Sequence, residues 1–407
     1  MGSFGSKPDT HANDATPVAG AKAKSAVSVR QWLRPGLRLQ AKRRHHDKKD
    51  GSGGSSLHNQ RNRSVACRPP TLTPMISFII QYYHHPQQLG PICERVCDRH
   101  VEIIVHADSY DPLDVRALKA AHAHYGAVII RSDNVHEIRG YNLAARRATG
   151  KYLAFSQDDR IPPPALCPNG SGGLSPCWVT SILAIFRDEA MRNLGAVGLH
   201  RGGSDLWTEE RTPLIGACGD ANDDTTGHKW TALFTRRMTT PIEFAAQLNI
   251  GPIVVRRQAF QQLGGFNVSY SRPGQMGIGF DFEFTTKLWT RGWQAAVVCP
   301  SARTAFRNGC GGKGSAAQLT ERQRLRDEHF DLYHGQFHKC WGALIRKRVA
   351  VAQRNLLRDS RLVSNLNRIL PDCIDCERAS VYEQALGFGQ GEACPTVARG
   401  TNITYED

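Results

Sequence analysis

The chain has 407 residues, of which 40% are hydrophobic and 22% charged, proportions that are typical of a folded globular protein. Its formal net charge of +15 would suggest nucleic-acid binding, but the charge is unevenly distributed. Residues 1–74 contain fourteen Lys and Arg against four Asp, a net charge of +10, which leaves only +5 for the rest of the chain. The basic N-terminal segment therefore accounts for most of the charge, and we expect no specific nucleic-acid recognition by the folded part.

This N-terminal segment is rich in Gly, Ser, Ala, Pro, Lys and Arg, and it includes KRRHHDKKDGSGGSS at 42–56. Such a segment cannot bury enough apolar surface to offset the entropy lost on ordering, so residues 1–74 are predicted to be a disordered basic tail. The sequence contains no run of about twenty apolar residues, the length that a transmembrane helix requires. We therefore expect no transmembrane span.

From Met75 onward, short apolar segments alternate with segments of helical periodicity. Two of the predicted helices should end at glycine, at Gly126 and Gly150. Alternation of helices with continuously apolar strands predicts an α/β fold, with a parallel sheet covered on both faces. The strands are expected at 75–80, 101–109, 127–134 and 151–159, and the helices at 89–100, 114–126 and 138–150.

The second half of the chain is less regular. It begins with a loop rich in Pro, Gly and Cys at 160–177, and polar loops are expected at 201–235. A double glycine at 264–265 should end one of its helices. The remaining predicted elements are a helix at 178–193, a strand at 195–200, a strand and helix at 249–267, a helix and strand at 280–299, and basic helices at 316–370.

Acidic residues follow three of the predicted strands, as Asp108, Asp133 and the pair Asp158 and Asp159. Ligands of parallel α/β sheets bind beyond the carboxyl ends of the strands, so these acids should lie at a ligand-binding edge. Two adjacent carboxylates there suit a hard divalent cation, Mg²⁺ or Mn²⁺, that also contacts a diphosphate. The alternative is that the pair belongs to a solvated turn before the sequence RIPPP.

Five segments, in this order along the chain, resemble family 2 glycosyltransferases with the GT-A fold. They span about residues 75–300, and the most specific part runs from Gly140 to Asp159. The segments are SFIIQYYHHP, IIVHADSYD, IRGYNLAARRATGKYLAFSQDD, GPIVVRRQAFQQLGGFN and GFDFEFTTKLWTRGW.

The resemblance implies a GT-A fold, a Rossmann-like and mostly parallel central sheet with helices on both faces. We expect this domain at 75–310, with a nucleotide-sugar half at 75–165 and an acceptor half at 178–310. A helical C-terminal extension at 311–370 and a Cys-containing tail at 371–407 should follow.

The resemblance also implies roles for residues of the donor site. Asp158 and Asp159 would bind the metal, although Gln157 stands where the family usually has an acid. The second strand ends His-Ala-Asp-Ser where the family usually has Asp-Asp-Gly-Ser, so either Asp108 contacts the nucleobase from a shifted position or base recognition differs. The residues expected to bind the nucleotide sugar are Gln81, Tyr83, Asp108, Asp133, Arg139, Asn142, Gln157 and Asp158.

On the acceptor side, the resemblance places the catalytic base at Asp281, with Glu283 as the rival. Such a base takes the proton of the acceptor hydroxyl as that hydroxyl attacks the sugar. The alternative is that Asp281 is simply an acid at a helix N-terminus, where the helix dipole favours negative charge. Asn249, Gly251 and Pro252 are expected to form part of the acceptor wall, and a plain turn before a strand is the alternative.

The sequence therefore predicts a glycosyltransferase, inverting and dependent on Mn²⁺ or Mg²⁺. It would move a sugar from a UDP- or GDP-sugar to a hydroxyl of a glycan, protein or lipid. One alternative is a catalytically degenerate relative that binds glycans or nucleotides, because Gln157 interrupts the metal motif. The other is a nucleic-acid-binding protein that uses the basic tail and the basic helices.

Cysteines and glycosylation sequons bear on the compartment. The chain has twelve cysteines, and Cys167 and Cys177 bracket a short loop that a disulfide would close. Sequons for N-glycosylation begin at Asn62, Asn169, Asn267 and Asn402. These features favour the Golgi or another secretory lumen. A cytoplasmic or membrane-peripheral location stays open, because MGSFGS at the start fits the N-myristoylation pattern.

Two further groups of residues have no assigned role. His84 and His85 follow the first strand and are interpreted as surface or structural residues, because no motif selects a histidine as a third metal ligand. Arg303, Arg307 and Lys313 lie near the glycine-rich NGCGGKG, where they either cover the diphosphate as a mobile lid or are ordinary exposed bases.

Overall fold

The computed structural model describes residues 73–168, 173–199, 240–272, 274–298 and 339–370, with short pieces at 202–203, 214–215, 235–236, 304, 306–308 and between 320 and 328. All of them belong to one compact unit, Arg63–Asp407. The predicted tails at 1–74 and 371–407 lie outside the described residues, except for residues 73 and 74. So do the sequons at Asn62, Asn169 and Asn402 and the predicted lid residues Arg303 and Lys313. The predicted domain boundaries stay predictions.

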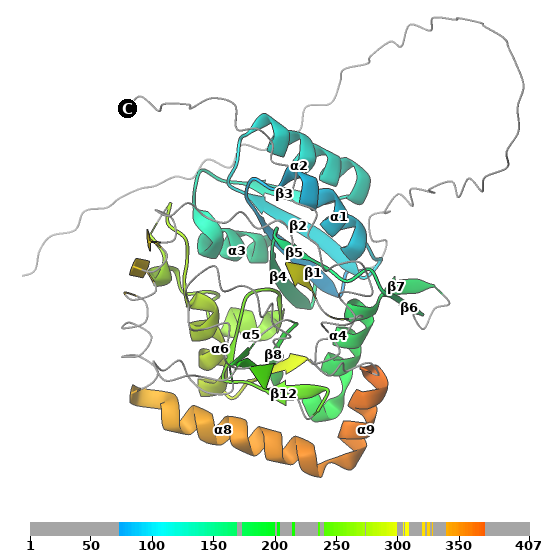
Figure 1. Cartoon of the computed structure of the whole chain (residues 1–407), viewed down its shortest axis with the longest axis vertical. Helices are drawn as coiled ribbons and strands as arrows, with labels where there is room; N and C mark the ends of the chain where they lie inside the picture. Colours follow the sequence, from blue (N-terminus) through cyan, green and yellow to red (C-terminus); the bar gives the residue numbers. More distant parts are fainter. Residues whose placement is uncertain are drawn as a thin grey trace, which may run out of the picture. The chain divides into compact units, whose positions relative to one another are not determined.

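The first half of the central sheet consists of parallel strands that share one direction (Figure 1). Strand β1 pairs with a neighbour on each side, so that Ile76 lies opposite both Val101 and Tyr152. The strands, in sheet order, are β4 (Tyr152–Gln157), β1 (Ile76–Tyr82), β2 (Val101–Ala107) and β3 (Val128–Arg131). Their register confirms the predicted parallel sheet over this half.

Three helices connect these strands: α1 (Pro86–Val96), α2 (Pro112–Tyr125) and α3 (His136–Arg147). Helix α2 begins where the Asp111 side chain accepts a hydrogen bond from Leu113 N, and it ends at Gly126, whose φ of 66° is left-handed, as predicted. The predicted end of α3 at Gly150 is wrong, because the helix stops at Arg147. The Glu102 carboxylate accepts hydrogen bonds from the amides at 149 and 150, which turns the chain into β4 before another helical turn forms.

The second half of the sheet contains strands of both directions. Strand β14 (Ile253–Arg256) is antiparallel to both β4 and β8 (Leu194–Gly198), and β12 (Ile242–Phe244) is antiparallel to β15 (Gln294–Val298). The complete order is β12-β15-β8-β14-β4-β1-β2-β3. The predicted α/β fold class, a mostly parallel central sheet with helices on both faces, is confirmed.

The other helices of this half are α4 (Cys177–Arg187), α5 (Arg257–Gln262) and α6 (Phe280–Thr290). The predicted single helix at 178–193 is wrong, because Asp188 is extended and its side chain accepts from Ala190 N, which starts the separate turn η1 (Glu189–Met191). The predicted double-glycine stop is confirmed: Gly264 and Gly265 both have positive φ.

The structure also contains short strands that were not predicted, β12 among them. Each of these strands has only two or three residues, which is too few to show the alternation of apolar and polar residues from which a strand is predicted. The others are β5 (Arg160–Ile161), β6 (Leu166–Pro168), β7 (Leu174–Pro176), β9 (Gly202–Gly203), β10 (Leu214–Ile215), β11 (Thr235–Arg236), β13 (Gln247–Leu248) and β16 (Arg307–Asn308).

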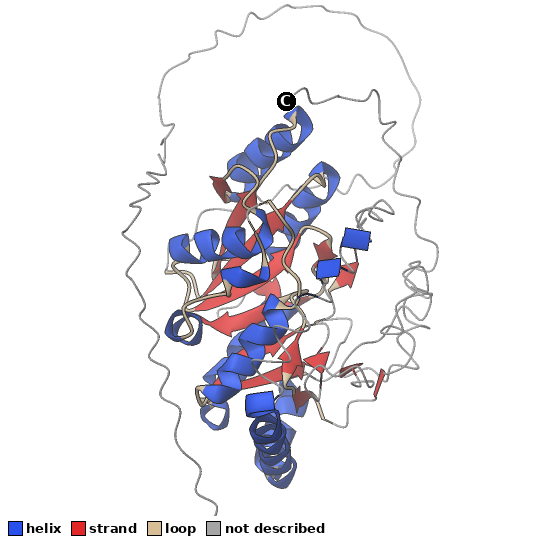
Figure 2. Ribbon diagram, turned by 90° about the vertical axis from the view of Figure 1, so that its left-hand side faces the viewer, coloured by secondary structure: helices blue, strands red, loops and turns tan. Residues whose placement is uncertain are grey.

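Helices cover both faces of the sheet (Figure 2). The Tyr82 hydroxyl bonds Asp114 of α2, whereas a Cβ added to Gly140 of α3 would meet the side chain of Gln81. Consecutive residues of a strand point to opposite faces, so α2 and α3 lie on opposite sides of β1. On the α3 side, Phe155 of β4 packs against Phe260 of α5 with ring centroids 5.0 Å apart.

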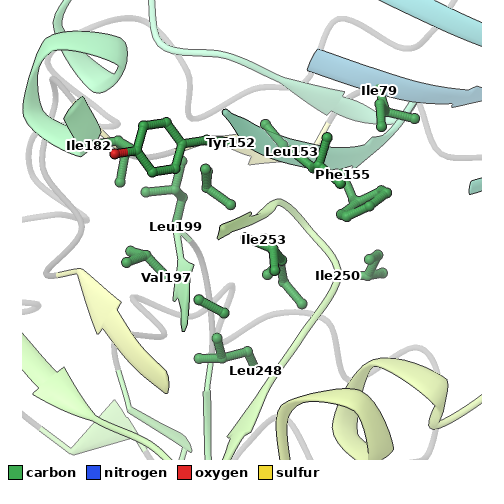
Figure 3. Packing of buried hydrophobic residues seen from close by; sticks show 14 of the residues in the cluster. Ile79, Tyr152, Leu153, Phe155, Ile182, Val197, Leu199, Leu248, Ile250 and Ile253 are labelled. Carbon is green, nitrogen blue, oxygen red and sulfur yellow. The ribbon is translucent and has the colours of Figure 1, made fainter. Parts of the chain in front are cut away.

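The core continues across the antiparallel strand β14. Figure 3 shows Phe155, Ile253 and Val197 as members of one hydrophobic cluster, and Ile253 pairs directly with Phe155 in the sheet. All three side chains are fully buried. The two halves of the sheet therefore share one hydrophobic core.

In the C-terminal part of the range predicted as basic helices, 316–370, the structure has two helices, α8 (Lys339–Arg358) and α9 (Ser360–Ile369). Helix α8 packs beside α6 and β12 (Figure 1), and Phe244 N donates to the Gln353 side chain at 3.0 Å. Within the described residues, no helix combines the length and the apolar character needed to cross a bilayer.

Gly150 provides a test of this architecture. A Cβ at Gly150 would lie 2.6 Å from Ser77 N, which is backbone of the central strand and cannot move aside. We expect Gly150→Ala to lower the free energy of unfolding by about 1–3 kcal/mol, measured by urea unfolding. The matched control is Gly90→Ala in α1, where a Cβ meets nothing within 4 Å and the gain in helix propensity should be up to about 1 kcal/mol. Equal effects of the two substitutions would contradict this packing.

Candidate active site

The carboxyl ends of β1, β2, β3 and β4 meet at one edge of the sheet. Tyr82 pairs with Ala107, Ala107 pairs with Arg131, and Gln81 pairs with Gln157. The residues that follow each strand are therefore neighbours along this edge. They include Tyr83, Asp108, Asp133 and Asp158. The acids at the ends of the predicted strands were expected to lie at this edge.

Asp158 is only 6% exposed and faces the segment that follows β1. Its Oδ2 accepts a hydrogen bond from Tyr83 N at 2.6 Å and lies 3.0 Å from His85 Nδ1. Burial raises the pKa of the Asp158 carboxyl, and the contact with His85 opposes this rise. Both contacts use Oδ2, so among the described residues Oδ1 has no hydrogen bond.

Asp159 follows directly and has an unsatisfied oxygen. Its Oδ1 is buried and has no hydrogen-bond partner in the described part of the chain, and the nearest cation, Arg160 Nε, lies 3.7 Å away. Arg160 therefore pairs with this oxygen electrostatically but does not hydrogen-bond it, and a buried carboxylate oxygen without a hydrogen bond can accept a further ligand.

These two carboxylates fit a divalent cation. Mg²⁺ is commonly held by one or two protein carboxylates together with phosphate and water oxygens, and free oxygens of Asp158 and Asp159 would supply the protein part. Among the described residues there is no cluster of three or more His, Cys, Asp or Glu that could hold a metal by itself. Any metal held by these two carboxylates would need further oxygen ligands besides them.

Asp281, at the start of α6, lies against the predicted acceptor segment. Its Oδ2 accepts from Ile250 N at 2.9 Å, between Asn249 and the cis peptide bond Gly251–Pro252, and its Oδ1 accepts from Phe282 N. The side chain is 5% exposed, and burial raises the pKa of its carboxyl to about 6. The structure thus brings the predicted base and the predicted acceptor wall together.

The metal motif and the acceptor segment meet through Arg160. A Cβ at Gly251 would lie 2.8 Å from Arg160 Nε, so only glycine lets the guanidinium group pass this close. The buried Tyr141 hydroxyl, which donates to Ser156 O at 3.0 Å, lies near the carboxylates of both regions. Burial raises its pKa well above the ordinary value, and the negative charges of Glu137, Asp159, Asp158 and Asp281 raise it further.

Glu283 is oriented toward other groups. Its Oε1 lies 3.0 Å from Lys287 Nζ and 3.4 Å from Asn267 Nδ2, and the side chain is 1% exposed. The Asn267 side chain also accepts from Ser269 N and so belongs to the turn that follows the double glycine. Asp281, rather than Glu283, contacts the acceptor segment.

Three of the residues predicted for nucleotide binding follow β1, β2 and β3. Asp108 accepts from Ser132 Oγ at 2.5 Å and from His136 N at 2.7 Å, so its carboxylate holds the first turn of α3. Asp133 accepts from the Tyr110 hydroxyl at 2.6 Å, and Tyr83 is 55% exposed. Tyr83 and Asp133 are therefore at the surface of the edge, whereas the Asp108 carboxylate is engaged within the protein.

Four more of the residues predicted for nucleotide binding, Gln81, Arg139, Asn142 and Gln157, make hydrogen bonds within the protein. Asn142 grips the backbone of Phe266 by donating to its carbonyl at 2.8 Å and accepting from its amide at 3.0 Å. The remaining bonds are Gln81 Oε1 to His106 Nδ1 at 2.8 Å, Arg139 Nη1 to Ser271 O at 2.8 Å, and Gln157 Nε2 to Glu137 Oε2 at 3.1 Å. These side chains fix the relative positions of β1, α3 and the turn before α6.

Two side chains at this edge were not predicted to take part. His84 and His85, interpreted from sequence as surface or structural, each contact a buried carboxylate: Asp114 for His84 and Asp158 for His85. The two adjacent histidines after a buried strand were the only sign in the sequence that this segment has a role. Their partners, Asp114 and Asp158, lie too far along the chain to be inferred from it.

Disulfides are present in the described part of the chain. Cys167 and Cys177 are joined, as predicted, and Cys97 is also disulfide-bonded. Cys93 is a buried free thiol.

Known proteins resemble this chain only distantly. No protein-family model and no curated protein sequence matches it. Among solved structures it is similar to the mannosyltransferase PcManGT from Pyrobaculum calidifontis in complex with GDP-Man and Mn²⁺, with 15% identity, a TM-score of 0.43, and coverage of 78% of this chain and 82% of that one. It is also similar to GalNAc-T7 with UDP, GalNAc and Mn²⁺, with 14% identity, a TM-score of 0.42, and coverage of 78% of this chain and 58% of that one. For S. aureus TarS 1-349 in complex with UDP, the identity is 11%, the TM-score is 0.38, and the coverage is 77% of this chain and 79% of that one. Similarity at this level does not indicate what this chain binds or transfers.

The raised pKa of Asp281 predicts a dependence of stability on pH. Between the ordinary pKa of 3.8 and about 6, the folded protein holds a proton that the unfolded chain has lost, so stability falls as pH rises through this window. Asp281→Asn removes this fall. The free energy of unfolding of the variant, relative to the natural chain, should therefore increase by up to roughly 3 kcal/mol between pH 4 and pH 7.

Urea unfolding at the two pH values measures this change. The control is Glu189→Gln, whose carboxylate is 85% exposed. A relative stability of Asp281→Asn that stays constant with pH would contradict the burial of this carboxylate.

Proposed function

We propose that the protein is a glycosyltransferase that moves a sugar from a nucleotide-diphosphate donor to a hydroxyl acceptor. The observation that carries the proposal is the arrangement of three carboxylates. Asp158 and Asp159, the latter with a buried oxygen that has no hydrogen bond among the described residues, lie at the carboxyl edge of the sheet. Asp281 bonds the predicted acceptor segment, which Arg160 also approaches.

The first pair suits the departing group. Asp158 and Asp159 would hold Mn²⁺ or Mg²⁺, which would offset the negative charge that develops on the departing nucleoside diphosphate. The partial burial of both carboxylates strengthens their attraction for a cation, since the local dielectric is low. His85 and Tyr83 N keep Asp158 Oδ2 in place, and this leaves Oδ1 for the metal.

Asp281 suits the acceptor. As the acceptor oxygen forms its bond to the anomeric carbon, the bond from that carbon to the diphosphate oxygen breaks, and the diphosphate leaves with the electron pair. The proton of the acceptor hydroxyl passes to a free lone pair of the Asp281 carboxylate. A carboxyl with a pKa of about 6 is a stronger base than an ordinary aspartate and is still ionised at neutral pH. A base on the side opposite the leaving group corresponds to an inverting displacement.

A second candidate is a degenerate relative that binds nucleotides without transfer. It is favoured by Gln157, which stands in the position of a metal-binding acid and donates its amide to Glu137. UDP binding that is indifferent to Mn²⁺, together with no turnover on a panel of donors, would support this candidate over the transferase.

A secretory compartment is proposed for the protein. It is supported by the disulfide between Cys167 and Cys177 and by the bonded Cys97, because disulfides persist in oxidising compartments.

The metal role of Asp159 is tested by Asp159→Asn, which removes the negative charge but keeps the shape of the side chain. We expect release of nucleoside diphosphate from a panel of UDP- and GDP-sugars to fall by at least about 100-fold, and Mn²⁺ binding in the presence of UDP, measured by electron paramagnetic resonance, to weaken. The control is Asp98→Asn, at the opposite, amino-terminal end of β2, which should retain both properties. Unchanged Mn²⁺ binding in Asp159→Asn would refute the assignment.

The role of Asp281 predicts the pH dependence of the reaction. The base must be ionised, so kcat/KM should decrease below about pH 6, with a slope of one, as the carboxyl takes up its proton. Asp281→Asn should lower kcat by roughly 10²–10⁴-fold and abolish this acid limb. An acid limb that persists unchanged in the variant would assign the base to another group.

A further inference from the structure

A buried carboxylate on α2 fixes the orientation of His84. Asp114 is 1% exposed and accepts from three side chains: the Tyr82 hydroxyl at 2.5 Å, Ser109 Oγ at 2.5 Å and His84 Nδ1 at 2.7 Å. Its position in the first turn of α2 further stabilises negative charge there.

These contacts determine which nitrogen of His84 carries the proton. A carboxylate only accepts hydrogen bonds, so His84 Nδ1 must donate, and in the neutral imidazole Nε2 then has a free lone pair. Ser109 Oγ bonds Asp114 and lies 3.3 Å from Nδ1, on the same side of the ring. The three residues therefore do not form a nucleophilic triad, in which the serine would contact the other nitrogen.

His84 is also held in an uncommon backbone conformation. Its φ is 59°, in the left-handed region, and its side chain is 49% exposed. Within the described part of the chain, Nε2 has no hydrogen-bond partner. A non-glycine residue in this conformation, fixed by a buried charge and with an open acceptor, is arranged to meet a ligand.

The position of His84 indicates which part of the ligand it meets. The residues on either side of it, Tyr83 and His85, both contact Asp158, and Ser109 brings the end of β2 next to it. A nucleotide whose diphosphate lies at Asp158 and that extends along the strand ends toward β2 would pass His84. The Tyr83 ring, centred 4.2 Å from the His84 ring, adds an exposed aromatic surface there.

We propose that His84 Nε2 is the hydrogen-bond acceptor that selects the nucleobase of the donor. The inference rests on the proposed function and extends it to the class of base. A fixed acceptor pairs with a ring imide N–H, as in uracil N3–H or guanine N1–H. Cytosine and adenine present a lone pair at the corresponding ring nitrogen, and two facing acceptors repel each other. The Asp108 carboxylate, already engaged by Ser132 and His136, is left to position α3.

UDP and CDP form a matched pair for the test, because N3 carries a hydrogen in uracil and a lone pair in cytosine. Their dissociation constants are measured by calorimetry on the full chain with Mn²⁺, in the same buffer for both nucleotides. We expect UDP to bind at least about tenfold more tightly than CDP. Asp114→Asn removes the charge that holds the proton on Nδ1, and an amide NH₂ that faces Nδ1 would move the ring proton to Nε2, so the preference for UDP should weaken, disappear or reverse.

His84→Asn is the second variant, since asparagine tolerates a left-handed φ and its amide offers both a donor and an acceptor. It should bind UDP and CDP with similar affinity, and it keeps the proposal testable if Asp114→Asn does not fold. The control is His122→Asn on α2, where Nδ1 is likewise engaged, by Ala127 O at 2.9 Å, but away from the strand ends; it should keep the preference.

The outcomes separate the two proposals. If the natural chain binds none of UDP, GDP and CDP, the proposed function itself fails. If it binds UDP but prefers CDP, or if His84→Asn retains the full preference for UDP, the role of His84 is overturned while the proposed function stands.

Discussion

The site depends on the in-register parallel pairing of β1 with both β2 and β4. Because Ile76 lies opposite both Val101 and Tyr152, the carboxyl ends of the strands reach the same edge. Each strand then delivers its next residues to that edge. A shift of register by one residue would turn the apolar side chains of β1 to the opposite faces, so the hydrophobic core and the site are fixed by the same interaction.

Burial of carboxylates gives the edge its chemical character. Asp158 and Asp281 are nearly inaccessible to solvent, and each is compensated by backbone amides that donate to it. Asp159 differs, because its buried Oδ1 has no hydrogen bond among the described residues and only the ion pair with Arg160 at 3.7 Å. Fixed donors favour the charged form and desolvation opposes it, so the balance differs from one carboxylate to the next. Such differences let one carboxylate bind a cation and another exchange a proton.

The two histidines after β1 link this chemistry to the fold. His85 contacts the carboxylate of β4, and His84 contacts Asp114 of α2, on the face of the sheet opposite α3. Neighbouring residues thus connect the strand end to two different layers of the molecule. This arrangement restrains the segment that lies closest to Asp158.

The amino-acid sequence by itself determined the longer strands of the central sheet, the acids at the ends of β2, β3 and β4, the glycines that end α2 and α5, and the acidic start of α6. These features follow from local periodicity, capping and backbone freedom. Only the tertiary structure decided that β14 runs antiparallel between β4 and β8, that Glu102 ends α3 early, and that Asp281 bonds Ile250, 31 positions away. It also decided the pairing of His84 with Asp114, 30 positions apart. Such contacts form because the folded chain excludes water from particular polar groups, which must then find partners in space, and no local pattern in the sequence records which partners those are.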